Sequence, residues 1–102
     1  MVDVDQMRAD LLRARKARDK TTEVALKRAL AAFDNAGAVA HTPDAVEVPR
    51  RELSHDDLVG IIRGEIAEAD AAAQQYDAGG QPDAAEKLRA ESAVLAAYLT
   101  GD

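Results

Sequence analysis

The chain of 102 residues carries a formal net charge of −6, and almost half of its side chains are apolar. This length allows one domain, and the absence of cysteine excludes disulfides, thiolate nucleophiles, iron–sulfur clusters and Cys-type zinc sites. No apolar run approaches the ~20 residues of a membrane-spanning helix, and acidic residues near Met1 replace the positive charge of a signal peptide, so we expect a cytoplasmic protein without a membrane partner.

Two helices joined by a short turn are predicted in the first third of the chain. Apolar residues recur at spacings of three and four from Asp3 to about Ala17, which predicts an amphipathic helix. Asp19 can cap a second helix, which should end between residues 36 and 40. Because the connection between them is short, these helices should be antiparallel neighbours.

A third helix is predicted after an irregular, proline-containing connector at about 41–53. The strongest signal for a helix start in the sequence is at Ser54, because Asp57 follows at the third helical position and completes a variant of the capping box. The helix should run from His55 to Ala78 and end at Gly79-Gly80, since glycine adopts the left-handed conformation at no steric cost.

A fourth helix opens at Pro82, because proline is favoured at the first helical position. Its apolar stripe continues to Leu99, so the third and fourth helices should form a long antiparallel hairpin. The predicted fold is therefore all-α, with two antiparallel helical hairpins in a single domain over residues 1–102.

The basic residues concentrate in the first half of the chain. Residues 8–28 contain eight basic and three acidic residues, whereas residues 52–102 contain three basic and eleven acidic residues. A basic helix face can contact phosphate or an acidic partner, although most charged faces are simply solvated. The candidate interaction surface consists of Arg13, Arg15, Lys16, Arg18, Lys20, Lys27 and Arg28.

The ionisable residues do not form a recognisable catalytic group. Ser54 is explained as a helix cap, and Ser92 has no histidine nearby in sequence, so no nucleophilic triad is predicted. His41 and His55 lack the helical spacing of a metal-binding pair. We therefore expect no catalytic residue, metal, cofactor or small-molecule substrate. Inter-helix polar contacts, with Glu65 and Glu91 in reach of the two arginines, are instead expected from Arg63, Glu65, Glu68, Arg89 and Glu91.

Several short motifs occur in a defined order along the chain. They are Asp19-Lys20, Phe33-Asp34-Asn35-Ala36, Arg50-Arg51-Glu52-Leu53-Ser54, Arg63-x-Glu65, Tyr76, Gly79-Gly80, Leu88-Arg89-Ala90-Glu91 and Tyr98-Leu99. Together they resemble the GatB/YqeY family, and in particular its short actinobacterial members. That family takes its name from the tail of the B subunit of tRNA-dependent amidotransferase and from a related stand-alone protein. The chain resembles the helical domain that precedes the tail in longer members.

The resemblance implies a non-catalytic helical interaction domain linked to tRNA-dependent amidation or to tRNA and translation. One alternative is an accessory component of an enzyme with carbon–nitrogen ligase activity that uses glutamine as amido-N-donor, a label that the family often carries. A second alternative is a structural homodimer, because helices of this length carry a longer apolar stripe than a bundle of four short helices needs to bury. A protein partner or self-association is expected ahead of tRNA.

Overall fold

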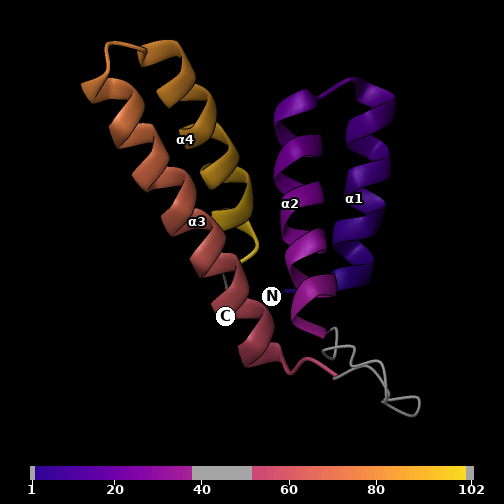
Figure 1. Ribbon diagram of the computed structural model, residues 1–102. Helices are drawn as coiled ribbons and strands as arrows, with labels where there is room; N and C mark the ends of the chain where they lie inside the picture. The colour runs from indigo at the N-terminus through magenta and orange to yellow at the C-terminus, as the bar shows by residue number, and fades with distance from the viewer. Residues whose placement is uncertain (1, 38–51, 101–102) are drawn as a thin grey trace, which may run out of the picture.

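The computed structural model describes residues 2–37 and 52–100, and within these ranges the chain forms four helices and no strand. Figure 1 shows two hairpins, with α1 beside α2 and α3 beside α4. The prediction of an all-α fold with two antiparallel hairpins is confirmed, and the C-terminal hairpin is the longer one. The four helices are α1 (Val4–Ala17), α2 (Lys20–Gly37), α3 (His55–Ala78) and α4 (Pro82–Ala97).

The predicted connector lies outside the described residues except for its last two positions, Glu52 and Leu53. None of the four helices in these ranges combines the length and the apolar character that a lipid bilayer requires of a spanning segment.

The starts of the helices follow from capping side chains. The carboxylate of Asp3 accepts hydrogen bonds from the backbone N–H groups of Asp5 and Gln6, at 3.0 and 3.2 Å, so α1 begins one residue later than predicted. The capping box of α3 is confirmed, because Ser54 Oγ accepts from the N–H of Asp57 at 3.1 Å and the Asp57 carboxylate accepts from the N–H of Ser54 at 3.0 Å. Each cap satisfies backbone donors that the first helical turn leaves without partners.

Asp19 caps α2 as predicted. Its carboxylate accepts a hydrogen bond from Thr22 Oγ1 at 2.7 Å and another from the backbone N–H of Thr22 at 3.1 Å. Hydrogen bonds to the charged form favour ionisation, and these two hold the pKa of the exposed Asp19 carboxyl below its ordinary value.

Two residues with positive φ close the turns of the hairpins. Gly80 has φ +76 after α3, in agreement with the predicted glycine turn. Arg18 has φ 57 after α1, and its backbone N–H donates to a carbonyl of the last helical turn. Left-handed backbone is uncommon for a residue with a side chain, and no feature of the sequence predicted it at Arg18.

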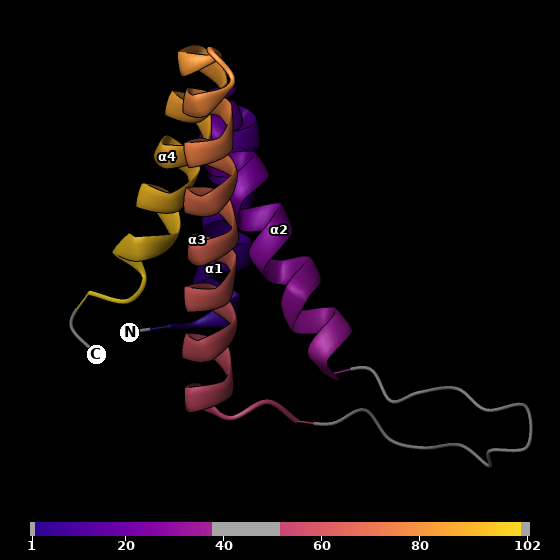
Figure 2. The same ribbon diagram turned by 60° about the vertical axis from the view of Figure 1, so that its left-hand side comes forward.

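The core is built around α2. Leu26 and Ala29 of α2 are fully buried, and they share one apolar cluster with Met7 of α1, Ile62 of α3 and Leu95 of α4. Among the described helices, the backbone of α2 lies close to each of the other three, whereas the backbone of α1 lies close to that of α2 alone. Figures 1 and 2 show that both hairpin turns lie at the same end of the molecule, so α2 and α4 run in the same direction.

Candidate interaction surface

Three cations surround one carboxylate beside the α1–α2 turn, a group named here the Glu23 cluster. Arg15 of α1 lies 3.8 Å from the Glu23 carboxylate, Lys20 lies 3.7 Å from it and Lys27 lies 3.5 Å from it. The Glu23 side chain is 13% exposed, whereas those of Arg15, Lys20 and Lys27 are 47%, 83% and 53% exposed. One carboxylate cannot neutralise three cations, so the cluster presents excess positive charge to solvent.

The other residues of the predicted basic surface take three different positions. Lys16 and Arg18 are exposed at the same turn as the Glu23 cluster. Arg13 forms an ion pair with Asp10 on another face of α1. Arg28 reaches across to α4. The structure therefore gathers five of the seven predicted residues near the turn and assigns Arg13 and Arg28 to contacts within the fold.

Arg28 forms one polar junction between the two hairpins. Its guanidinium donates a hydrogen bond to the Glu91 carboxylate of α4 at 3.3 Å. Burial raises the pKa of Glu65 on α3, and a hydrogen bond and like charge from Glu68 raise it further, whereas the charge of Arg28 lowers it. One arginine of α2 thus acts on carboxylates of both helices of the second hairpin.

The predicted inter-helix contacts involve partners that the sequence did not indicate. Glu91 pairs with Arg28, which is 63 positions away in sequence and lies outside the proposed set. Arg89 donates to Asp77 at 2.6 Å and joins α4 to α3. Arg63 is exposed on α3. The pairing of Glu91 depends on how the hairpins dock, and no local spacing in the sequence encodes that arrangement.

Ser92 joins α3 and α4 within the second hairpin. Ser92 is 6% exposed, and its hydroxyl donates a hydrogen bond to the Asp70 carboxylate at 2.8 Å. A buried hydroxyl requires a hydrogen-bond partner, and Asp70 supplies it. The sequence analysis did not identify this contact, although the position of Ser92 on the apolar stripe of α4 is the signal that could have indicated it.

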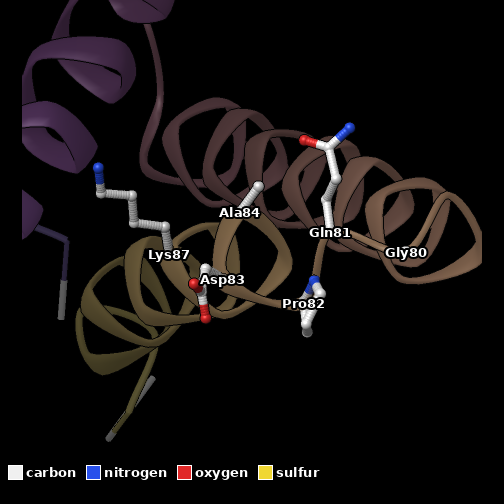
Figure 3. Close-up of a pocket in the computed structure, with 6 residues that line it drawn as sticks. All are labelled: Gly80, Gln81, Pro82, Asp83, Ala84 and Lys87. Carbon is white, nitrogen blue, oxygen red and sulfur yellow. The ribbon is translucent and has the colours of Figure 1, made fainter.

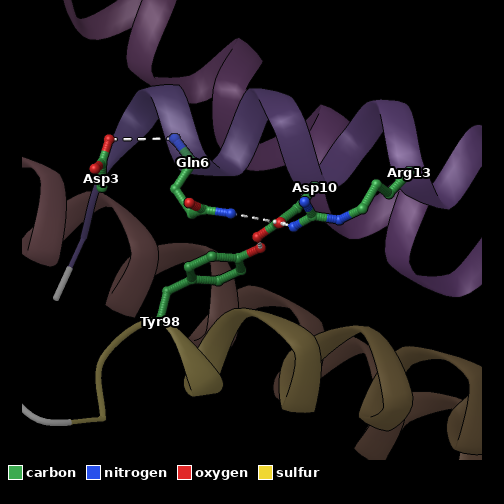
Figure 4. Close-up of polar contacts among 5 residues, drawn as sticks. All are labelled: Asp3, Gln6, Asp10, Arg13 and Tyr98. Carbon is green, nitrogen blue, oxygen red and sulfur yellow. Dashed lines mark hydrogen bonds and ion pairs between the residues drawn. The ribbon is translucent and has the colours of Figure 1, made fainter.

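A second polar group, the Asp10 cluster, joins α1 to the end of α4. Figure 4 shows Gln6, Arg13 and Tyr98 around the carboxylate of Asp10. Tyr98 Oη donates to this carboxylate at 2.5 Å, Gln6 Nε2 donates at 2.9 Å, and Arg13 forms an ion pair with it. Burial raises the pKa of the Tyr98 phenol, and the charge of Arg13 acts in the opposite direction. Donors from both hairpins therefore meet at the carboxylate of Asp10.

Among the concave regions lined by described residues, two lie at opposite ends of the fold. The first, of about 570 Å³, lies beside the α3–α4 turn, and Figure 3 shows Lys87 extending from it toward the α1–α2 hairpin. Its lining residues are Gly80, Gln81, Pro82, Asp83, Ala84 and Lys87. The second, of about 340 Å³, is named here the Phe33 pocket. It is lined by Val4, Arg8, Phe33, Asp34, Gly37, Leu53 and Leu58.

The described residues offer charge and shape rather than a set of reacting groups. Neither concave region is lined by a serine, threonine, cysteine or histidine, and the ionisable side chains of the first are Asp83 and Lys87. Within residues 2–37 and 52–100, no three His, Asp or Glu side chains gather as a metal site would require. The Glu23 cluster, by contrast, presents excess positive charge to solvent.

Comparison with protein families places the chain in a known family. The family described as Yqey-like protein matches residues 4–101, which is nearly the whole chain. Neither a curated protein nor a solved structure matches the chain.

Proposed function

The chain belongs to the YqeY-like family, and from this premise we propose that it is a non-catalytic helical interaction domain for a protein of tRNA-dependent amidation or translation. The single observation that carries the proposal is the Glu23 cluster. Its three cations are exposed, and the partly buried Glu23 carboxylate holds them on one side of the hairpin. Such an arrangement is complementary to an acidic protein surface, and complementary charge raises both the association rate and the specificity of a complex.

A protein is proposed as the partner ahead of tRNA because the cluster lacks aromatic platforms. The sequence contains three aromatic residues, and none of them belongs to the cluster. Phe33 is buried in the core, Tyr98 donates to Asp10, and the exposed Tyr76 lies on α3 of the other hairpin. Binding of unpaired bases depends on exposed aromatic rings, whereas recognition of carboxylates requires only the cations.

The proposal is tested by capture with two purified baits, the multi-subunit tRNA-dependent amidotransferase and tRNA, presented separately. We expect the wild-type chain to bind the amidotransferase and the double variant Arg15→Glu, Arg18→Glu to lose that binding. The matched control is Arg63→Glu, Lys87→Glu, which makes the same change in net charge at exposed positions of the second hairpin and should bind as the wild type does.

Two outcomes would contradict the proposal. The first is equal loss of binding in the control variant, because the effect would then reflect net charge alone. The second is binding of tRNA but not of the amidotransferase, with an affinity that falls steeply as salt is raised. That dependence marks release of counterions from phosphate and would identify nucleic acid as the partner.

A further inference from the structure

One side of α1 carries a stripe with an exposed apolar residue. Val4, Arg8 and Leu12 recur every four residues, so they share a face of the helix. Leu12 is 56% exposed and is the most exposed large apolar residue in the described ranges. Arg8 is 63% exposed, and its partner Asp5, at 3.5 Å, is still more exposed. A solvated pair of this kind is weak, so Arg8 is available to another carboxylate.

The lower end of this stripe opens into the Phe33 pocket. Val4 and Arg8 line the pocket together with Leu53 and Leu58, and Phe33 forms part of its wall while remaining 5% exposed. The volume of about 340 Å³ is many times the ~30 Å³ share of one water molecule. The pocket therefore has room for an apolar side chain, with the Arg8 guanidinium nearby.

The two apolar positions have a spacing that a helix can match. Val4 and Leu12 are separated by two turns, or ~12 Å along the axis of α1. On an amphipathic helix, residues at i and i+7 lie on one face about 10.5 Å apart. Arg8 lies between the two positions, and Arg15 lies one turn beyond Leu12. Carboxylates that flank the apolar anchors of such a helix would meet both arginines.

We propose that this face of α1, from the Phe33 pocket to Leu12, is a docking site for an acidic amphipathic helix of a partner protein. One apolar anchor of the partner enters the Phe33 pocket, and the other covers Leu12. Arg8 and the excess positive charge around Arg15 favour acidic over basic helices, and the pocket lining itself contributes one carboxylate, that of Asp34. The inference rests on the proposed function and names the chemistry of the partner surface.

The test uses a stapled helical peptide with two leucines at i and i+7 and glutamates between and beside them. Fluorescence anisotropy measures its binding to the full chain. We expect Leu12→Ser to weaken binding by at least about fivefold, since loss of a central apolar anchor removes a large part of binding energy, and Arg8→Glu to weaken it comparably. Val24→Ser is the matched control, because Val24 is an exposed apolar residue of α2, and it should leave the affinity unchanged.

A second peptide of the same composition, with its leucines on opposite faces of the helix, separates docking from charge attraction. Equal binding of the two peptides would overturn the inference, as would unchanged affinity in Leu12→Ser. Sedimentation equilibrium adds a third arm: a concentration-dependent dimer of the chain that Leu12→Ser abolishes would assign this face to a second copy and overturn the acidic-helix proposal.

The two proposals fail separately. If Leu12→Ser binds the peptide as the wild type does, while Arg15→Glu, Arg18→Glu still abolishes capture of the amidotransferase, the docking inference is wrong and the proposed function stands. If the peptide results hold and the amidotransferase does not bind, the face recognises acidic helices and the proposed function is wrong.

Discussion

The phenol of Tyr98 donates a hydrogen bond to the carboxylate of Asp10 across 88 positions of sequence. Among the described helices, the backbone of α1 lies close to that of α2 alone, and this bond gives α1 a direct polar link to the second hairpin. Asp10 also accepts from Gln6 and pairs with Arg13. The side chain of Asp10 is largely covered, and these protein donors take the place of water as hydrogen-bond partners of its carboxylate.

Replacing Tyr98 with phenylalanine should destabilise the fold by about 1–2 kcal/mol, as expected for a hydrogen bond to a charged group. Urea unfolding near neutral pH measures the loss. Because burial raises the folded pKa of Tyr98 above its ordinary 10.0, the wild type should also lose stability as pH rises through that raised pKa. The Tyr98→Phe variant should lack this alkaline loss, and the same decline in both proteins would contradict the assignment.

Arg28→Met should destabilise the protein by about 1–3 kcal/mol, because it leaves the carboxylate of Glu91 poorly solvated and without its cation. The side chain of Glu91 is 13% exposed and that of Arg28 is 38% exposed, so solvent screens part of the attraction. A double-mutant cycle with Glu91→Gln should give a coupling of about 0.5–1 kcal/mol. A coupling of zero would show that the ion pair does not hold the hairpins together.

Glu65→Gln should stabilise the protein at neutral pH and have little effect in acid. Burial, together with Glu68, raises the folded pKa of Glu65 above its ordinary 4.5, so the folded state holds this proton more tightly than the unfolded chain. The free energy of unfolding therefore falls as pH rises from that ordinary value through the raised pKa. Urea midpoints at about pH 4 and about pH 7 test the sign, with the exposed Glu86→Gln as control.

Two glycines in the interior of α3 should be replaceable with a gain in stability. A Cβ atom added at Gly60 or Gly64 would meet nothing within 4 Å apart from its chain neighbours and the adjoining backbone of its own helix, and alanine in a helix is favoured over glycine by about 0.5–1 kcal/mol. Gly80→Ala should instead cost about 1 kcal/mol, because its φ is +76 although the space around it is open. Thermal unfolding of the three variants should therefore give midpoint shifts of opposite sign.

Truncation of Ile62 to alanine should cost about 2–5 kcal/mol, as for other fully buried aliphatic side chains. Ile62 is 0% exposed, whereas Leu58 is only partly buried against the core, so Leu58→Ala should cost less. Ser54→Ala should cost about 1 kcal/mol through loss of the N-cap of α3. If all three variants unfold with the same midpoint as the wild type, the assignment of the α3 core face and cap is wrong.

The helices could be predicted because their determinants are local. Ser54 and Asp57 lie three residues apart, and Asp19 and Thr22 also lie three residues apart, so each cap can be read from a few neighbouring letters. The exception is Arg18, whose left-handed backbone is imposed by the turn and not by its side chain.

The contacts between hairpins could not be predicted in the same way. Glu91 finds Arg28, and Asp10 finds Tyr98, only after α2 has docked against α4. Sequence spacing within α3 and α4 suggested nearer arginines for the glutamates. Five of the seven proposed basic residues lie together near the turn of the first hairpin, but their organisation around Glu23 depends on the approach of Arg15 from a different helix.

The central position of α2 also has a consequence for the order of assembly. Each hairpin is made of contacts between residues that are near in sequence, and such contacts form fastest. The parallel pairing of α2 with α4 joins distant parts of the chain, so the two hairpins should form first and dock afterwards. In native-state hydrogen exchange, the amides of α2 should then open only with the whole domain, whereas those of α3 and α4 beside Gly80 should exchange through smaller, local openings.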